Sequence, residues 1–236
     1  MKNKRGLNLL ILTAAVTALF GACVEVGELE EKVHSIPLDG VESLKVELDM
    51  GAGKLNLHGG TIDLMEGSFV YNVEEWKPEI DYYVSEGKGL LEIEQGRHPG
   101  IPMGDSENEW NISLNDRIPM DVKLDLGAGE TNLDFQGLLL NSLVVDMGVG
   151  ELTLDLSGER TQSVDVNIQG GIGSATIYLP EKVGVRVNVE KGIGSVDSNG
   201  LHKEGHIYTN DSFGKTKVSV EVNIEAGIGS VDLRLK

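Results

Sequence analysis

The chain of 236 residues is short of several residue types that common architectures need. A single cysteine, Cys23, leaves no intramolecular disulfide to stabilise a small domain. Beyond residue 22, no long stretch has apolar residues at the 3.6-residue spacing of an amphipathic helix. These absences exclude a disulfide-stabilised scaffold and a helical bundle, and they favour a β fold.

Positive charge is scarce as well. The chain carries 20 Lys and Arg residues against 38 Asp and Glu residues, which gives a formal net charge of −18 at pH 7. A surface of this sign is repelled by the phosphates of nucleic acids and by anionic lipid head groups. No nucleic-acid partner is therefore expected.

The first 22 residues have the layout of a secretory signal peptide. Met1–Gly6 is basic, Leu7–Phe20 is a mostly apolar run of 14 residues, and small residues follow. This run is shorter than the roughly 20 residues that a membrane-spanning helix needs. Residues 1–22 are therefore predicted to be a removable signal and not part of the fold.

The end of this signal resembles the lipobox of bacterial lipoproteins. The resemblance lies in Leu19–Cys23, LFGAC, with Phe20 where that family usually has Leu. It implies cleavage before Cys23 and acylation of this residue, which would hold the protein at a membrane outside the cytoplasm. The alternative is an ordinary signal peptide followed by an incidental cysteine. Cleavage removes three basic residues and no acidic one, so a mature chain of 214 residues would carry a net charge of −21.

A Gly-x-Gly motif recurs along the mature chain in strand-like surroundings. Three consecutive spacings between copies are 21, 23 and 21 residues, which indicates a structural repeat. The six copies begin at Gly51, Gly127, Gly148, Gly171, Gly192 and Gly227.

Aligning the copies on their first glycine places apolar residues in fixed columns. The column three residues upstream holds Leu48, Leu124, Val145, Ile168, Val189 and Ile224. The column five residues upstream holds Val46, Val122, Leu143, Val166, Val187 and Val222. A downstream column holds Leu57, Leu133, Leu154, Ile177 and Leu233, with Ser198 as its exception. The residues between are mostly polar, so each unit reads as a strand with one buried face, a glycine bend and a second strand.

A unit of this size cannot bury a core alone, but it can do so when stacked on its own copies. The predicted fold is all-β: a single-domain β-solenoid, β-helix-like, whose short strands bend at the glycine motifs. Glycine suits such corners because it reaches positive φ without strain. In the fourth copy, Gly171 and Gly173 become bends, and Ile172, Ile177 and Leu179 become core residues.

The predicted mature chain has three parts. Residues 23–40 form the lipidated cysteine and an acidic tether, residues 41–117 an N-terminal β region with antiparallel strands, and residues 118–236 the solenoid repeats. The 35-residue spacing before the last copy predicts an inserted loop or hairpin within Ser198–Lys215. The last copy reaches the chain end, so Leu233 is expected to pair into the stack.

Six of the 11 aromatic residues lie between residues 41 and 117. One interpretation is that they close the open end of the solenoid, because solenoids need atypical capping units. The other is an aromatic platform for a glycan. The candidate glycan contacts are Trp76, Tyr82, Tyr83 and Trp110.

An acidic column stands two residues before each glycine motif. It holds Asp49, Asp125, Asp146, Glu190 and Glu225, interrupted by Gln169. Stacked at strand spacing, these carboxylates would form an outward ladder that could recruit Ca²⁺, a cation that prefers oxygen ligands. The alternative is a row of solvated carboxylates that discourages aggregation.

Familiar catalytic and cofactor motifs are not matched. A dinucleotide fingerprint needs a third glycine and a following helix, and a phosphate loop needs Gly-Lys-Ser/Thr. Among the five histidines, only His202 and His206 are suitably spaced for a metal, and they lie in a glycine-containing loop. We expect no cofactor, no resident metal and no enzyme activity.

The ordered set of repeats resembles a known family. LDMGAGKLNLHGG, WNISLNDRIPMDVKLDLGAGETNLDFQGL, VVDMGVGELTLDLSG and the terminal GIGSVDLRL are similar to the bacterial toast-rack family, over roughly Val41 to Lys236. That family includes the C-terminal domain of LiaF-like, cell wall-active antibiotic response proteins. The resemblance implies a β-solenoid-like domain of the cell envelope and carries no catalytic residues.

These features together predict a non-catalytic, membrane-anchored envelope lipoprotein that serves as a binding or scaffold domain, and the family resemblance implies a link to envelope stress. Its expected partners are the membrane, through the lipid anchor, and envelope proteins or cell-wall glycan. The alternative is an adhesin-like glycan-binding or carbohydrate-active β-helix protein.

Overall fold

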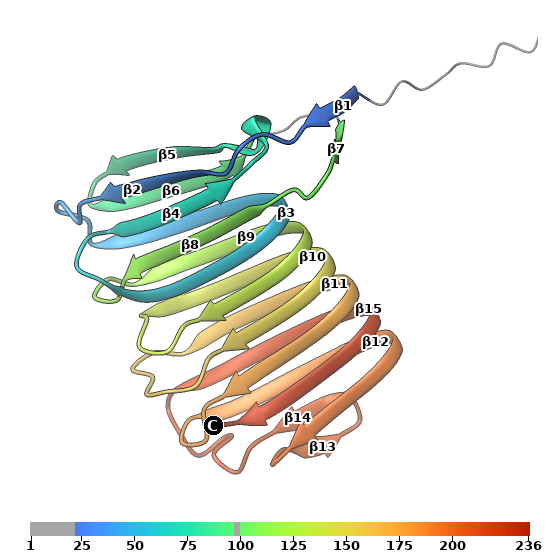
Figure 1. The fold of residues 1–236 in the computed structure, drawn as a ribbon. Coiled ribbons are helices and arrows are strands. Elements are labelled where there is room, and N and C mark those ends of the chain that lie inside the picture. Colours follow the sequence, from blue (N-terminus) through green and yellow to red (C-terminus); the bar gives the residue numbers. More distant parts are fainter. Residues whose placement is uncertain (1–21, 97–99) are drawn as a thin grey trace, which may run out of the picture.

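The computed structural model describes residues 22–96 and 100–236. Figure 1 shows these residues wound into a rack of bent strands stacked along one axis, with the earliest strands at one end and the C-terminal strands at the other. Nearly all regular structure is β, and a 3₁₀ turn at Glu74–Trp76 interrupts it. Within the described ranges, no helix is long and apolar enough to cross a membrane.

The six strands that contain Gly-x-Gly form the repeating unit of the rack. Each runs toward its glycine motif, bends there and runs back, so it has a first leg before the motif and a second leg after it. We call each such bent strand a coil. The coils are β3 (Ser43–Thr61), β9 (Met120–Asp134), β10 (Leu140–Asp155), β11 (Val164–Leu179), β12 (Gly184–Asn199) and β15 (Ser219–Leu235).

The coils pair in parallel and in register, in the order β3, β9, β10, β11, β15, β12. The last coil in the sequence therefore lies between β11 and β12. Coil β12 carries Ser198 where the others have Leu or Ile, and Ser198 stands beside Leu233 of β15. Inserting β15 buries Leu233 within the stack and leaves the more polar coil at its end.

The core lies between the two legs, as the apolar columns predict. Every residue in the two upstream columns is buried, and so are the five aliphatic residues of the downstream column. Burial of each such side chain is worth roughly 1.5–3 kcal/mol. Leu179 is buried with Ile177, whereas the side chain of Ile172, predicted to be in the core, lies outside the described parts of the chain.

Glycine is needed at the bends for a reason that the sequence only partly indicates. The second glycine has positive φ in several coils, for example +147° at Gly129 and +149° at Gly194. The first glycine does not, yet a Cβ on Gly171 would lie 2.5 Å from the carbonyl oxygen of Gly148 in the next coil. Close approach of stacked backbones, and not φ, therefore requires glycine at the first position in the five coils other than β3.

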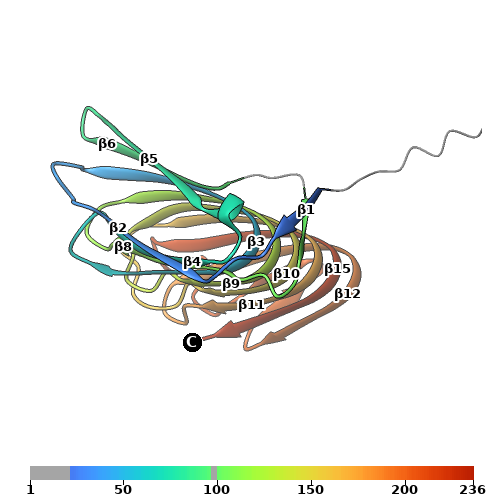
Figure 2. The ribbon, with the colours of Figure 1, turned by 45° about the horizontal axis from the view of Figure 1, so that its top comes forward.

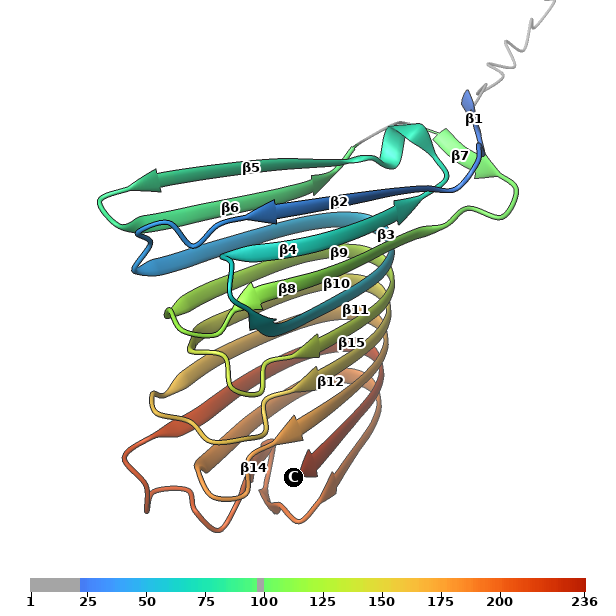
Figure 3. The ribbon, with the colours of Figure 1, turned by 60° about the vertical axis from the view of Figure 1, so that its left-hand side comes forward.

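Turns on the side opposite the bends join one coil to the next, as Figure 3 shows. Single polar side chains hold several of these turns. The Arg160 guanidinium donates hydrogen bonds to the carbonyl oxygens of Phe135, Leu138 and Leu156, and its burial lowers its pKa. Asn210 Nδ2 likewise donates to carbonyl oxygens of the turn after β11.

Further strands cover both legs of β3 at the N-terminal end. On the second leg, β8 (Asn108–Asn115) pairs with β3, β4 (Met65–Tyr71) with β8, and β2 (Glu30–Ile36) with β4. On the first leg, β6 (Lys88–Gln95) pairs with β3 and β5 (Pro78–Ser85) with β6. Figure 2 shows the β5–β6 hairpin on one side and β2 and β4 on the other. We call these five strands the cap.

The predicted tether is not wholly a tether. Of residues 23–40, those at 30–36 form β2, an edge strand of the main sheet antiparallel to β4. Strand β1 (Ala22–Glu25) pairs in parallel with β7 (Gly100–Met103) beside the cap. The reason is that β4 has an open edge after pairing with β8, and the acidic segment supplies the strand that fills it.

The C-terminal end is covered by a hairpin. Strands β13 (His202–Glu204) and β14 (Ile207–Thr209) are antiparallel, and β14 pairs with Arg186–Asn188 of β12. The sequence predicted an inserted loop or hairpin between the last two repeats, and the structure shows a hairpin. It buries Tyr208 against the core.

Candidate functional site

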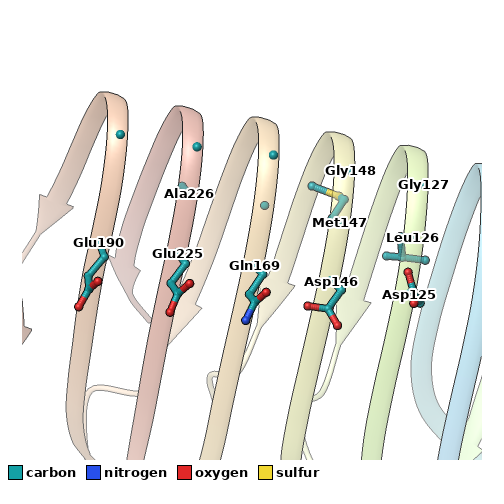
Figure 4. Close-up of a pocket in the computed structure, with 14 residues that line it drawn as sticks. Asp125, Leu126, Gly127, Asp146, Met147, Gly148, Gln169, Glu190, Glu225 and Ala226 are labelled. Carbon is teal, nitrogen blue, oxygen red and sulfur yellow. The ribbon is translucent and has the colours of Figure 1, made fainter.

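The acidic column predicted from the sequence is a ladder in the structure. Strand register places its members side by side in the order Asp49, Asp125, Asp146, Gln169, Glu225 and Glu190. Figure 4 shows the last five projecting the same way from neighbouring coils, just before the bends. Paired strands lie about 4.8 Å apart, so the carboxylates repeat at that spacing, with one amide among them.

An open groove of about 1020 Å³ follows this ladder. The ladder side chains from Asp125 to Glu190 line it, together with Leu126, Met147 and Ala226 and the first glycines of five coils. The glycines that allow close stacking thus also leave the groove free of side chains at the bends. The result is an elongated surface with acidic groups along one side and bare backbone along the other.

The ladder is longer than the sequence indicates, because it continues onto the cap. Glu94 of β6 stands beside Asp49, and Glu79 of β5 stands beside Glu94. These two strands carry no glycine motif, so alignment of the repeats gave no signal for them. With them, the ladder comprises seven carboxylates and Gln169 across eight neighbouring strands.

The ladder is an extended row and not a cage. Its members come from parallel positions on successive strands, so each carboxylate has at most one ladder neighbour on either side. In the part of the chain that the structure describes, no three His, Cys, Asp or Glu side chains converge closely enough to hold a metal ion. The arrangement suits contacts repeated along a partner, and calcium binding stays a prediction.

The four candidate glycan contacts do not form one platform. Trp110 is fully buried: its ring meets Phe69 edge-on at 5.5 Å between centroids, and its Nε1 donates a hydrogen bond to Asn108 Oδ1 at 3.0 Å. The interpretation of Trp110 as a glycan contact is therefore wrong, because alternation along β8 points this ring into the core. It supports the capping role instead.

The other three aromatic residues are separated. Tyr82 faces inward against the core, where burial and then the charge of Asp39 raise its pKa. Tyr83, next along the strand, faces outward and is 57% exposed. Trp76, in the 3₁₀ turn, is half-buried and borders a groove of about 430 Å³ that also includes Asp49 and Asp125. Only Trp76 therefore lies beside the acidic ladder.

The two histidines with metal-like spacing lie on the C-terminal hairpin. His202 Nε2 is 2.6 Å from Asp211 Oδ1, and this hydrogen bond lowers the pKa of Asp211. His206 lies in the turn between β13 and β14, where its backbone carbonyl accepts a hydrogen bond from Val189 N–H. His202 thus contributes a contact within the segment after β12, and the backbone of His206 connects the hairpin to β12.

The predicted lipidation site lies at the N-terminal boundary of the described chain. The backbone of Cys23 is in β1, opposite Ile101 of β7. The side chain of Cys23 and residues 1–21 of the predicted signal lie outside the described parts. Figure 1 places β1 at the capped end of the rack, far from β12.

Comparisons with known proteins place the chain in a family. The sequence profile for the N-terminal domain of toast-rack matches residues 25–178, and the profile for the C-terminal region of LiaF, of the cell wall-active antibiotics response, matches residues 128–233. The first match begins before the region that the repeats alone delimit and includes β2. No curated protein matches the chain.

Among solved structures, a candidate cell adhesion protein from Clostridium sporogenes is 45% identical to this chain. The match covers 89% of this chain and 100% of that one, with a TM-score of 0.86. Candidate adhesins from Bacteroides fragilis and Parabacteroides distasonis are 11% and 10% identical over 89% of this chain and 99% of theirs, with TM-scores of 0.33 and 0.26. The chain therefore belongs to the toast-rack family, with a LiaF-like C-terminal region.

Proposed function

We propose that this protein is a non-catalytic, membrane-anchored lipoprotein of the cell envelope that binds an extended partner along its acidic ladder. The observation that carries the proposal is the ladder itself: seven carboxylates and one glutamine in register across eight strands, beside an open groove. A rigid row of like charges at about 4.8 Å intervals matches a partner that repeats polar or cationic groups.

The family supports a place in the envelope and a link to envelope stress. The description of the matched LiaF profile names the response to cell wall-active antibiotics. Neither matched family is an enzyme family, and the 45% identical relative is named for cell adhesion. A scaffold that contacts wall or envelope components fits both descriptions.

Binding along the ladder is tested with the soluble chain, residues 24–236, and immobilised purified cell-wall polymers, with polylysine as a cationic probe. The ladder variant combines Asp146→Asn, Glu190→Gln and Glu225→Gln. The control combines Glu130→Gln and Glu151→Gln, exposed carboxylates on the second legs. We expect the ladder variant to lose most retention and the control to keep it. Equal retention by both variants would refute the ladder as the binding surface.

The anchor is tested separately in cells that incorporate a labelled fatty acid. The wild-type chain is expected to acquire the label and to partition into detergent, whereas Cys23→Ser stays unlabelled. Label on Cys23→Ser, or no label on the wild type, would contradict the proposed anchor. Neither result would bear on binding along the ladder.

A glycan-binding, adhesin-like role is the second candidate, and the half-buried Trp76 beside the ladder favours it. Trp76→Ala is expected to weaken retention on wall glycans, whereas Tyr83→Ala, on the outer face of β5, is not. Release of soluble sugars from these polymers would indicate a carbohydrate-active enzyme instead.

A further inference from the structure

The stack is left incomplete at its C-terminal end. In the described part of the chain, Ser195–Asn199 on the second leg of β12 has a neighbouring strand on one side only, namely β15. The hairpin strand β14 pairs with Arg186–Asn188, which lies on the first leg. We call Ser195–Asn199 the open edge. An exposed strand edge is a template for pairing with another strand.

Apolar surface adjoins the open edge. Ile193, at the bend of β12, is 71% exposed. Within the edge, Val196 is only half-buried, whereas Leu152 and Val231 at the same register position of β10 and β15 are buried; the smaller Ala175 of β11 is half-buried as well. The end coil therefore presents part of its inward face as well as its edge.

Charge changes along the stack in a way that singles out this end. Residues 24–179 contain nine basic and 30 acidic residues, whereas residues 180–236, which include β12 to β15, contain eight of each. Two copies of the chain repel each other through most of their surface. The C-terminal end is the part through which they approach with the smallest such penalty, because Asp197 is the one acidic residue within the open edge.

We propose that two copies of this chain associate end to end through the open edge of β12. A two-fold arrangement pairs the two edges antiparallel, each copy contributing the same surface. This pairing continues the sheet of second legs across the interface and covers Ile193 and Val196 of both copies. The strongly acidic caps then lie at the two far ends, where their mutual repulsion is smallest.

The end-to-end arrangement determines where the two N-termini of the pair lie. Strand β1 lies at the capped end of the rack and the open edge at the other. Pairing through the open edges therefore points the two N-termini in opposite directions. If each N-terminus is anchored, the pair bridges two facing membranes. This bridging rests on the proposed anchor, whereas the pairing itself does not.

Cross-linking in solution tests the contact. Residues 24–236 contain no cysteine, and a relative of similar extent has been crystallised. Ser195→Cys places one thiol at the open edge. Glu151→Cys places one at the same register position in an interior coil, and both positions are exposed. With a short bis-maleimide, we expect several-fold more covalent dimer for Ser195→Cys. Equal yields would overturn the proposal.

Sedimentation equilibrium provides a second test that needs no cross-linker. The wild type is expected to shift from monomer to dimer as its concentration rises. Ile193→Lys should remain monomeric. Val149→Lys changes the residue between the two motif glycines of β10, the position that Ile193 has in β12; it is 51% exposed and should behave as the wild type. Circular dichroism checks that both variants fold. A wild type that is monomeric throughout, or a dimer that tolerates Ile193→Lys, would contradict the open edge as the contact.

Bridging is tested with beads that carry the chain from residue 23 onward, coupled through Cys23. We expect beads with the wild type to cluster and beads with Ile193→Lys to stay dispersed. Dimers in solution without clustering would refute bridging and leave the pairing intact. The lipidation experiment with Cys23→Ser tests the proposed anchor and neither the pairing nor the bridging.

Discussion

The two ends of the stack are closed in different ways. At the N-terminal end, β5 and β6 cover the first leg of β3, and β8, β4 and β2 cover the second. The cap also has its own large side chains, Phe69, Tyr71 and Trp110, all fully buried. At the C-terminal end, a hairpin of two short strands covers part of one leg and buries Tyr208.

This difference shows what a stack of identical units lacks. An interior coil is stabilised from both sides by copies of itself, so a repeated apolar column is enough for its core. An end coil has no copy on one side and needs other sequence to cover it. About 80 residues cover the N-terminal end of the stack, and about 20 cover the C-terminal end. The predictions below first compare the two ends and then test contacts between interior coils.

The largest expected effect is at the cap. Trp110→Ala removes a fully buried ring and leaves a cavity, which is expected to lower the free energy of unfolding by about 3–5 kcal/mol. Tyr208→Ala at the opposite end should cost less, because fewer strands depend on it. Both are measured by denaturant unfolding at equilibrium. A Tyr208→Ala cost that equals or exceeds that of Trp110→Ala would remove the distinction between the ends.

The interior depends on close contacts between the motif glycines of neighbouring coils. In Gly171→Ala the new methyl group would collide with the backbone of Gly148, at a cost of about 1–3 kcal/mol from overpacking. In Gly51→Ala, at the same motif position beside the cap, the nearest atom to the new methyl group is Oε1 of Gln95 at 3.7 Å, so this substitution should be tolerated.

The neighbouring Gly170 supplies a control within the same coil. A Cβ there would meet no atom within 4 Å, and the equivalent residue of β15 is Ala226. Gly170→Ala is therefore expected to be neutral or slightly stabilising in thermal melts. If Gly51→Ala proved as damaging as Gly171→Ala, strain at the bend would outweigh contact between coils.

The residue that follows the last coil in the sequence, β15, ties that coil to β10. Asp155 Oδ2 accepts a hydrogen bond from Lys236 Nζ at 2.7 Å, and Oδ1 accepts one from Ser157 N–H at 2.9 Å. Burial alone would raise the pKa of Asp155, but these hydrogen bonds outweigh it and lower the pKa below its ordinary value. A depressed pKa adds stability above the unfolded-state pKa, and this contribution disappears as Asp155 becomes protonated.

Asp155→Asn is therefore expected to be less stable than the wild type at neutral pH, with a smaller effect than the glycine substitution. The difference should shrink as the pH falls below about 4, the ordinary range of carboxyl groups. Unfolding curves recorded from pH 7 to pH 2 measure it, with Glu151→Gln as an exposed control. A difference that stays constant with pH would show that lost packing, and not the ionised carboxylate, is responsible.

The smallest effect concerns the ladder that joins the two ends. Gln169→Glu would complete the row of carboxylates. Like charges directly opposite each other on paired strands are destabilising, so we expect a loss of about 0.2–1 kcal/mol at low ionic strength. At 1 M salt, where the Debye length is about 3 Å, the loss should vanish.

The same variant tests calcium. If the ladder binds Ca²⁺, excess calcium should raise the melting temperature of Gln169→Glu more than that of the wild type, and a chelator should reverse this. Melting curves that are identical with calcium and with chelator would show that the carboxylates are simply solvated.

The sequence predicts the interior of the molecule far better than its ends. The apolar columns around Leu124 and Ile177 recur in six copies, and repetition separates this signal from ordinary strand alternation. The cap offers one copy of each feature. Neither β2, in an acidic segment, nor the burial of Trp110 could be distinguished from alternatives, because a single strand does not reveal which neighbour covers which face.

The residues of the candidate site likewise differ in whether the repeats predict them. The ladder from Asp49 to Glu225 follows from the repeat alone, because in-register stacking places equivalent residues side by side. Its extension to Glu94 and Glu79 does not, because β6 and β5 carry no motif that fixes their register. Of the aromatic candidates, Trp76 lies beside the ladder, whereas Trp110 is buried and is no longer a candidate.

By itself, the sequence determined the bends, the core columns and the acidic row, because each is a local pattern repeated at a fixed spacing. Only the tertiary structure decided the order of the coils. The link between β12 and β15 is long enough to let β15 enter the stack beside β11. The more polar β12 consequently lies at the end with one edge open, since burying Leu233 is worth more than burying Ser198.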